Sequence, residues 1–367
     1  MNILTSLLTA AVRAPSGDNT QPWKFEIDAK EQQIALFVDE SRDLSPMNAG
    51  QRMARIACGA VLENILVTAQ QHGLNADLNF SAAPSVTVHL TRATAVSAHH
   101  SPAVLSARVT NRRHYDARAL AAETLAALKH ATPILEDVST CWINDRQRID
   151  RLARLIGRAD AAMFGERSMR RAFYDNIRFD AARDAEVQEG LPVGSLEISA
   201  PERLGMRLIL RMPNAVLKAC GASCVFRSHA QALVRSSSGV CLIVAPDRSP
   251  LSDIHVGRAM QRAWLALTEA GLATQPMMSL PVLANALDHG SPELVAALGR
   301  TRITALLDEL QRLVPELGNG RPAALLRFGY APPPSARTGR LPLQAVLREV
   351  EVGSVSAPHA ALVESVL

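Results

Sequence analysis

A ten-residue stretch near the amino terminus gathers polar groups in one turn, and it reads Ala14-Pro-Ser-Gly-Asp-Asn-Thr-Gln-Pro-Trp23. Residues 4–12 before it are predicted to form a short apolar helix, and residues 24–27 after it a strand. A Pro-Ser-Gly-Asp-Asn turn leaves backbone N–H groups outside regular structure and adds a hydroxyl and an amide side chain. Such a loop suits the polar edge of a flat heterocycle. The alternative is a plain helix-to-strand turn that Trp23 anchors.

Two groups of arginines have the chemistry of a phosphate site. Arg108 and Arg112 flank Thr110, which places two guanidinium groups around a hydroxyl. Arginine binds phosphate through two parallel hydrogen bonds, and threonine adds a short donor. Arg337 and Arg340 follow a predicted strand, residues 325–330, near the carboxyl terminus. The alternative is that these arginines are solvated surface residues.

An internal repeat connects two predicted helices. Residues 59–74 read GAVLENILVTAQQHGL, and residues 257–272 read GRAMQRAWLALTEAGL. Both have an apolar stripe at helical spacing and end in Gly-Leu, where the glycine is a typical helix cap. A turn with the sequence Pro276-Met-Met-Ser279 follows only the second copy. It is either a ligand-facing turn or a methionine-rich turn of the core.

Residues 14–23 match, nearly letter for letter, the APS-x-x-N-x-QPW signature of the FMN-dependent nitroreductase family. The two repeats resemble the central helix of that family, which occurs once in each subunit of an intertwined homodimer. The chain therefore resembles a single-chain branch of the family that includes the dormancy-associated nitroreductase-like flavoproteins. The resemblance implies an α+β fold, with a central mixed or antiparallel sheet flanked by helices and two pseudo-symmetric halves in one chain.

The resemblance also assigns roles to residues. Arg108, Thr110, Arg337 and Arg340 would hold the FMN phosphate, and Arg112 would approach the N1/O2 edge of the ring. Residues 276–279 would form the turn beside flavin N5, with the backbone of Met278 and Ser279 closest to that atom. The full set of predicted cofactor-binding residues is Pro15, Ser16, Gly17, Asn19, Arg108, Thr110, Arg112, Pro276, Met277, Met278, Ser279, Arg337 and Arg340.

The two halves are predicted to be unequal. Residues 1–104 contain the signature loop, whereas residues 105–367 contain the phosphate element, the N5 turn and the terminal arginines. One complete site can be assembled from both halves, so we expect one FMN per chain. The charged stretch 158–199 is predicted to be either a lid over the flavin or a plain surface insertion.

The resemblance implies an FMN-dependent oxidoreductase that transfers two electrons or a hydride through flavin N5. NAD(P)H is the expected transient reductant, and no side chain needs to act as a catalytic group. The substrate would be a small organic molecule: a nitroaromatic, a quinone or a biosynthetic intermediate. Two alternatives are a lid-covered protein that sequesters FMN with little turnover, and a scaffold that binds no flavin.

Composition narrows the remaining classes. The 367 residues are 48% hydrophobic, but no apolar run approaches the length of about 20 residues that crosses a bilayer. The net charge of +4 is scattered, which gives no support for a nucleic-acid site. Five irregularly spaced cysteines indicate free thiols and no metal site. We therefore expect a cytoplasmic protein with no membrane partner, either a monomeric pseudo-dimer or a further homodimer.

Overall fold

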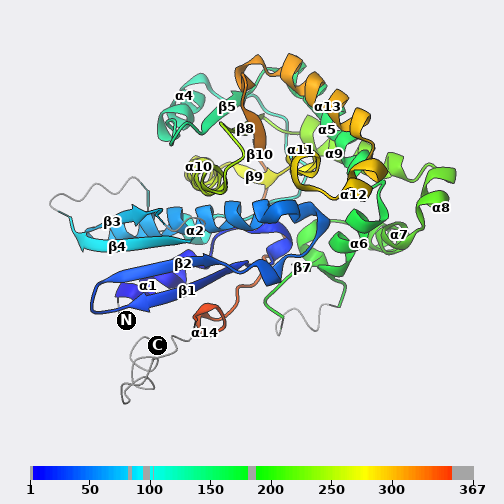
Figure 1. Ribbon diagram of the computed structural model, residues 1–367. Coiled ribbons are helices and arrows are strands. Elements are labelled where there is room, and N and C mark those ends of the chain that lie inside the picture. The colour runs from blue at the N-terminus through cyan, green and yellow to red at the C-terminus, as the bar shows by residue number, and fades with distance from the viewer. Residues whose placement is uncertain (1–2, 82–84, 94–99, 102, 181–186, 349–367) are drawn as a thin grey trace.

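The computed structural model describes residues 3–81, 85–93, 100–101, 103–180 and 187–348. Within these residues the chain forms two four-stranded sheets with long helices between and around them (Figure 1). Residues 181–186, which belong to the predicted lid, lie outside the described residues.

The first sheet lies in the amino-terminal part of the chain. Its strands are β1 (Trp23–Asp28), β2 (Gln33–Val38), β4 (Val86–Arg92) and β3 (Leu74–Asn79), in that spatial order and all antiparallel. Alternate residues of β4 are buried, as expected for a strand with one face on the core. Trp23 is fully buried beneath the signature loop, which agrees with its predicted anchoring role.

The second sheet has the order β5 (Ser139–Ile143), β8 (Gly239–Ala245), β10 (Arg321–Gly329) and β9 (Ala273–Pro276), again antiparallel. Every residue of β8 is buried, which explains its continuous apolar sequence. The predicted α+β class with antiparallel pairing is confirmed. The strands form two separate sheets, however, where the sequence predicted one central sheet.

Helices make up most of the remaining structure. The longest two, α2 and α10, carry most of the two repeats. Two short strands, β6 (Ile177–Arg178) and β7 (Leu191–Pro192), pair in parallel between α6 and α7 in the chain. The helices are α1 (Ile3–Ala11), α2 (Arg52–Gln71), α3 (Val104–Ala107), α4 (Ala122–Ala131), α5 (Arg146–Met163), α6 (Arg167–Asp175), α7 (Ala200–Arg211), α8 (Asn214–Ala219), α9 (Ser223–Arg235), α10 (Pro250–Glu269), α11 (Ser279–His289), α12 (Pro292–Leu298), α13 (Arg300–Leu313) and α14 (Leu343–Val346).

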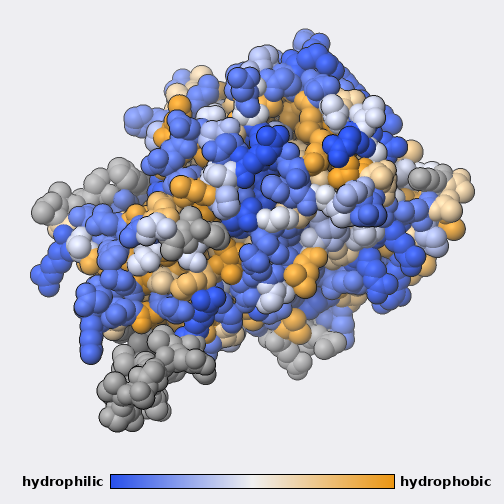
Figure 2. Space-filling view, viewed as in Figure 1, coloured by the Kyte–Doolittle hydropathy of each residue, from blue (hydrophilic) through white to orange (hydrophobic). Residues whose placement is uncertain are grey.

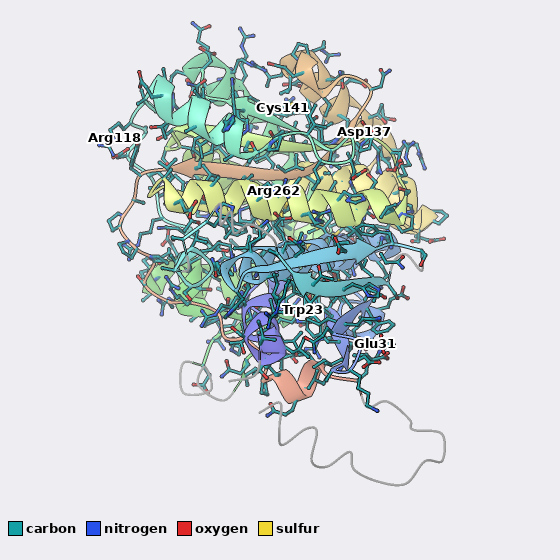
Figure 3. The ribbon with its side chains drawn as sticks, turned by 90° about the vertical axis from the view of Figure 1, so that its left-hand side faces the viewer. Trp23, Glu31, Arg118, Asp137, Cys141 and Arg262 are labelled. Carbon is teal, nitrogen blue, oxygen red and sulfur yellow. The ribbon has the colours of Figure 1, made fainter. Side chains whose placement is uncertain are left out.

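The helices α2 and α10 cross between the two sheets. In Figure 1 α2 lies across the view while α10 is seen nearly end-on above it, and Figure 3 shows Arg262 of α10 between the layers. A Cβ atom on Gly59 would lie 2.0 Å from the Ile254 carbonyl oxygen, and one on Gly257 would lie 1.9 Å from that of Ile56. The two contacts are equivalent under exchange of the helices, as expected for a pseudo-two-fold axis.

The carboxyl-terminal segment returns to the first sheet. Leu347 bridges Phe25 of β1, and the Arg348 N–H donates to the Phe25 carbonyl oxygen at 2.8 Å. Val346 is buried in the core of that sheet. The division of the chain into two halves at residues 104 and 105 stays a prediction. The carboxyl-terminal segment belongs to the second predicted half but packs on the sheet of the first.

No helix in the described part of the chain combines the length and the apolar character needed to pass through a membrane. Nor do the described residues contain a group of histidine, cysteine and acidic side chains that could hold a metal ion.

We expect Gly257→Ala to destabilise the fold by on the order of 3 kcal/mol, because the added methyl group forces the two backbones apart. Chemical denaturation would measure this change. Gly205→Ala on α7 is the matched control, since nothing lies within 4 Å of its added Cβ. The control should be neutral or more stable by up to about 1 kcal/mol. Equal stability of the two variants would contradict a tight crossing.

Candidate functional site

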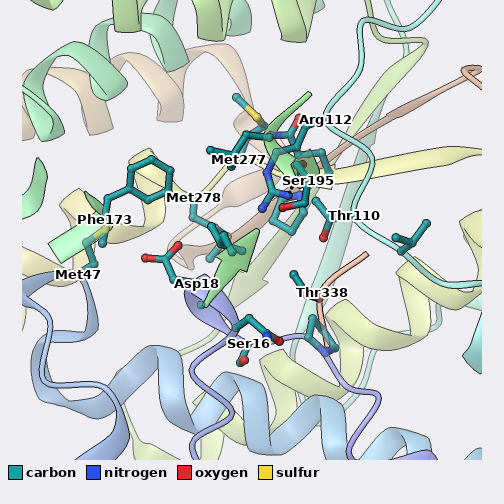
Figure 4. A pocket seen from close by; sticks show the side chains of 18 of the residues that line it. Ser16, Asp18, Met47, Thr110, Arg112, Phe173, Ser195, Met277, Met278 and Thr338 are labelled. Atoms are coloured by element: carbon teal, nitrogen blue, oxygen red, sulfur yellow. Dashed lines mark hydrogen bonds between the residues drawn. The ribbon is translucent and has the colours of Figure 1, made fainter. Parts of the chain in front are cut away.

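One cavity of about 410 Å³ brings together all of the predicted site residues. The predicted residues come from four separate segments: the signature loop, the segment that follows α3, the turn between β9 and α11, and the segment before α14. Figure 4 shows Ser16 and Thr338 on one side of this space and Thr110, Arg112, Met277 and Met278 on another. Residues more than 300 positions apart thus share one site.

The signature loop has an unusual backbone. Asp18, Asn19 and Gln21 all have positive φ angles, of 44°, 60° and 53°. Such angles are uncommon outside glycine and need support from the surroundings. The Ser16 hydroxyl accepts the Gln21 N–H at 3.0 Å, which closes the turn. The Gln21 amide donates to the Gln188 carbonyl oxygen at 2.9 Å and so braces the loop from outside.

Asn19 lies in the cavity wall, but its amide is also used within the protein. Its Nδ2 group donates to the carbonyl oxygens of Gly190 and Gly339, both at 3.3 Å, and its Oδ1 atom accepts from Arg340 at 2.9 Å. The sequence predicted that Asn19 lines the edge of a bound ring. The structure adds that Asn19 ties three distant segments together at that edge.

Four arginines gather at one end of the cavity: Arg13, Arg108, Arg337 and Arg340. Arg108 is buried with its guanidinium group 4.7 Å from the centre of the Trp264 ring, and it donates to the Arg13 carbonyl oxygen at 2.6 Å. Burial, together with the charges of the other three, lowers the pKa of Arg108 to about 9. Burial and Arg13 lower the pKa of Arg340 to about 10.

This cluster is short of negative charge. Among the described residues no carboxylate forms an ion pair with any of its four members. The Nε atoms of Arg108 and Arg340 are buried and have no hydrogen-bond partner in the structure. Buried cations are normally paired. An anion bound here would satisfy both the charge and the unused donors.

Arg112 and Thr110 occupy the wall between the two ends. The Arg112 guanidinium group donates to the Ser195 carbonyl oxygen at 3.0 Å, and the backbone of Thr110 forms a parallel β-bridge with Thr274 of β9. Burial lowers the pKa of Arg112, while nearby Asp18 acts against that shift. Arg112 therefore lies between the arginine cluster and an acidic part of the cavity.

The turn at residues 276–279 leads from β9 into the first turn of α11. The Met277 N–H is taken by the Leu325 carbonyl oxygen at 2.8 Å, within the second sheet. Ser279 begins α11, and the N–H groups of a first helical turn have no partner within the helix. The Met277 N–H is therefore used within the second sheet, and the role of the Met278 and Ser279 N–H groups beside flavin N5 stays a prediction.

The opposite end of the cavity is apolar and acidic, and the sequence did not predict it. Its aromatic wall comes from Phe164, Phe173 and Phe226. Burial, with Asp43 nearby, raises the pKa of Asp18 to about 6, and burial raises the pKa of Asp160 to about 7. Figure 4 shows Asp18 between Met278 and Phe173. This end can accommodate an apolar ring beside carboxyl groups that exchange a proton near neutral pH.

The segment that covers the cavity differs from the predicted lid at 158–199. Residues 158–163 belong to α5, an 18-residue helix that packs in the core of the second sheet. Cover comes instead from Phe173 of α6, from Ser195 and Ile198, and from Met206 and Phe226 beyond the predicted boundary. Residues 181–186 lie outside the described part. Whether this cover acts as a lid stays a prediction.

No protein-family model matches the chain, but several known proteins are similar to it in sequence. The chain is 28% identical over 344 residues to "Uncharacterized protein MT1398" of Mycobacterium tuberculosis, covering 90% of this chain and 46% of the relative. The chain thus spans about half the length of that relative. It is also 28% identical over 358 residues to "Putative NAD(P)H nitroreductase acg" of the same species, covering 94% of this chain and 95% of that protein. This similarity, over nearly the full length of both chains, agrees with the resemblance that the motifs indicated.

Two solved structures share more distant similarity. One is the FMN-dependent nitroreductase NfnB from Mycobacterium smegmatis in complex with NADPH, with a TM-score of 0.37, 16% identity, and coverage of 68% of this chain and 97% of that one. The other is a nitroreductase with bound FMN from Bacteroides fragilis, with a TM-score of 0.30, 13% identity, and coverage of 70% and 96%.

We expect Asp160→Asn to stabilise the protein above neutral pH. A pKa raised from 3.8 to about 7 means that the folded chain binds more protons than the unfolded chain between these values, so the wild-type loses stability as the pH rises through this window. The amide does not titrate. The variant should therefore gain on the order of 2 kcal/mol over wild-type by pH 8, less than the full shift implies because the carboxyl group faces the cavity.

Urea denaturation at pH 4.5 and at pH 8 would measure this gain. The control is Asp308→Asn, at an exposed position on α13. A difference between the Asp160 variant and wild-type that does not grow with pH would contradict a raised pKa of Asp160.

Proposed function

We propose that the chain is a flavoprotein oxidoreductase that binds one FMN in this cavity and takes electrons from NAD(P)H. The observation that carries the proposal is the arginine cluster, which lacks negative charge and lies at one end of a cavity lined by the signature loop and the turn at residues 276–279. A full-length relative is named for NAD(P)H nitroreductase activity, which supports the same assignment.

The residues fit the parts of FMN. Arg108, Arg337 and Arg340 supply cationic donors for a phosphate, and Thr110 adds a hydroxyl. Pro15, Ser16, Gly17 and Asn19 would line the edge of the ring, and Arg112 would stand near its pyrimidine part. Pro276 and Met277 would shape the turn from which the backbone N–H groups of Met278 and Ser279 face the ring.

Bound FMN would supply the capacity to accept and donate two electrons or a hydride. The chain itself would bind the cofactor, exclude water and manage protons. A cation such as Arg112 favours negative charge that develops beside it. Asp18 and Asp160, whose pKa values are raised to about 6 and about 7, can hold a proton next to a bound substrate near neutral pH.

The substrate would be a small organic molecule with an aromatic or quinonoid ring. Phe164, Phe173 and Phe226 offer rings for stacking at the end away from the arginines. Nitroaromatics, quinones and an intermediate undergoing dehydrogenation share this chemistry.

A second candidate function is sequestration of FMN with little turnover. It is favoured by the cover over the cavity, to which Ser195, Ile198, Met206 and Phe226 contribute. A closed cover would leave no room for a nicotinamide to stack on the ring.

Two measurements distinguish the oxidoreductase from the FMN-sequestering protein: the number of FMN molecules bound per chain, and the reduction of that FMN by NAD(P)H. Purified protein, reconstituted with FMN, should hold about one FMN per chain, and anaerobic NADPH or NADH should bleach its absorbance. One FMN that resists bleaching by either nucleotide would support sequestration. A chain that remains colourless after reconstitution would contradict both functions.

The phosphate assignment has its own test. Arg337→Gln, at a mostly exposed position, should weaken FMN binding by about tenfold to a hundredfold, because one charge-assisted contact is lost. Titration of apoprotein with FMN, followed by flavin fluorescence, would measure this loss. Arg302→Gln on α13 is the control, and equal affinity of the two variants would contradict a phosphate at the arginine cluster.

A further inference from the structure

The helices α7, α8 and α9 expose an unusual share of the apolar surface. Of the six described large apolar side chains that are most exposed, four lie on these helices: Leu204, Leu208, Val216 and Val225, with exposed fractions of 63%, 59%, 49% and 52%. The other two, Leu44 and Ile134, lie elsewhere in the chain. The helices α7 and α8 lie at the outer right-hand edge of the molecule in Figure 1, and Figure 2 shows warm-coloured atoms at that edge.

The helix α7 has two distinct faces. Leu204 and Leu208 are four residues apart and both exposed, so they form one stripe. Arg207 and Arg211 are exposed and fall beside this stripe at helical spacing. Met206, two residues from either leucine and thus on the opposite side, lines the cavity. The outward face is therefore both apolar and cationic.

The charge carried by the helices α7–α9 themselves is almost entirely positive. Between residues 200 and 235 the only acidic residue is Glu202, whose side chain accepts the hydrogen bonds of the Ser199 N–H and hydroxyl in the capping box of α7. The basic residues in the same range are Arg203, Arg207, Arg211, Lys218, Arg227 and Arg235. A second copy of the chain docked on this face by two-fold symmetry would place these arginines against one another. An anionic surface has the complementary charge.

We propose that the outward face of α7–α9, formed by Leu204, Leu208, Val216 and Val225 with the arginines beside them, binds the surface of anionic lipid bilayers. An interfacial segment combines exposed apolar side chains that enter the headgroup region with lysines and arginines that attract anionic lipids. The sequence predicted no membrane partner because no segment can span a bilayer. Binding at the surface needs no span.

The proposal also places the cavity close to the lipid. Met206 and Phe226 line the cavity from the same helices that carry the exposed stripe. An apolar ring compound dissolved in a bilayer would therefore meet the cover of the cavity first. The surface proposal stands independently of whether the cavity binds FMN.

Co-sedimentation with vesicles tests the proposal with the full-length chain. Binding is expected to vesicles of phosphatidylcholine mixed with phosphatidylglycerol, and little binding to phosphatidylcholine alone. The variant Leu204→Gln with Leu208→Gln should bind at least about tenfold more weakly, because two apolar side chains no longer enter the headgroup region. The control pair is Leu44→Gln with Ile134→Gln, which removes similar side chains at more exposed positions and should bind like wild-type.

The cysteines provide a second readout. Cys220 and Cys224 are exposed beside α8 and α9, whereas Cys58, Cys141 and Cys241 are buried. In a Cys220→Ser background, a polarity-sensitive dye on Cys224 should shift to the blue when anionic vesicles are added. The proposal would be overturned if the protein neither bound the vesicles nor shifted the dye fluorescence. It would also be overturned if the Leu204/Leu208 variant and the Leu44/Ile134 variant lost vesicle binding to the same extent. Light scattering that shows a dimer lost only in the Leu204/Leu208 variant would assign the face to a second copy.

Discussion

The close crossing of α2 and α10 is the constraint on which the rest of the structure depends. Gly59 and Gly257 leave no room for a Cβ atom, so the two backbones meet directly. Each glycine faces the carbonyl oxygen three residues before the other, at Ile254 and Ile56. An intertwined homodimer would make such a contact between two subunits. Here one chain makes it with itself, and a sheet lies on either side of the crossing.

Buried polar pairs fix the register of this crossing. Asp253 accepts from Arg52 at 2.7 Å and from Arg55 at 2.8 Å, and all three side chains are nearly inaccessible to solvent. Further along, the Gln261 amide donates to Asn64 at 2.7 Å. Buried ion pairs add little net stability, because desolvation offsets their attraction. A shift of one helix along the other would leave these charges buried and unpaired, so they select one alignment.

The crossing is symmetric, but the segments attached to it are not, and the site follows from that difference. The signature loop precedes α2, whereas the turn at residues 276–279 follows α10. The carboxyl-terminal segment carries Arg340 to the signature loop, where it donates to Asn19, before continuing to β1. One chain therefore assembles one set of these segments around a cavity. In the described part of the chain only residues 246–249 connect β8 to α10, so the second copy of the helix has no equivalent loop directly before it.

The sequence could predict the parts of the fold that local signals encode. The repeated glycine, the apolar strand at 239–245 and the signature loop all have short-range patterns. Of these motifs, the signature loop is the one whose residues line the cavity. Asp160 had no such signal, because an acid on an amphipathic helix looks solvated until its packing is known. Its helix α5 packs against α9, α11 and α13, and only that tertiary packing turns the carboxyl group toward the cavity. The same reasoning applies to Leu204 and Leu208: they look like core residues in sequence, and only the position of α7 at the edge of the molecule leaves them exposed.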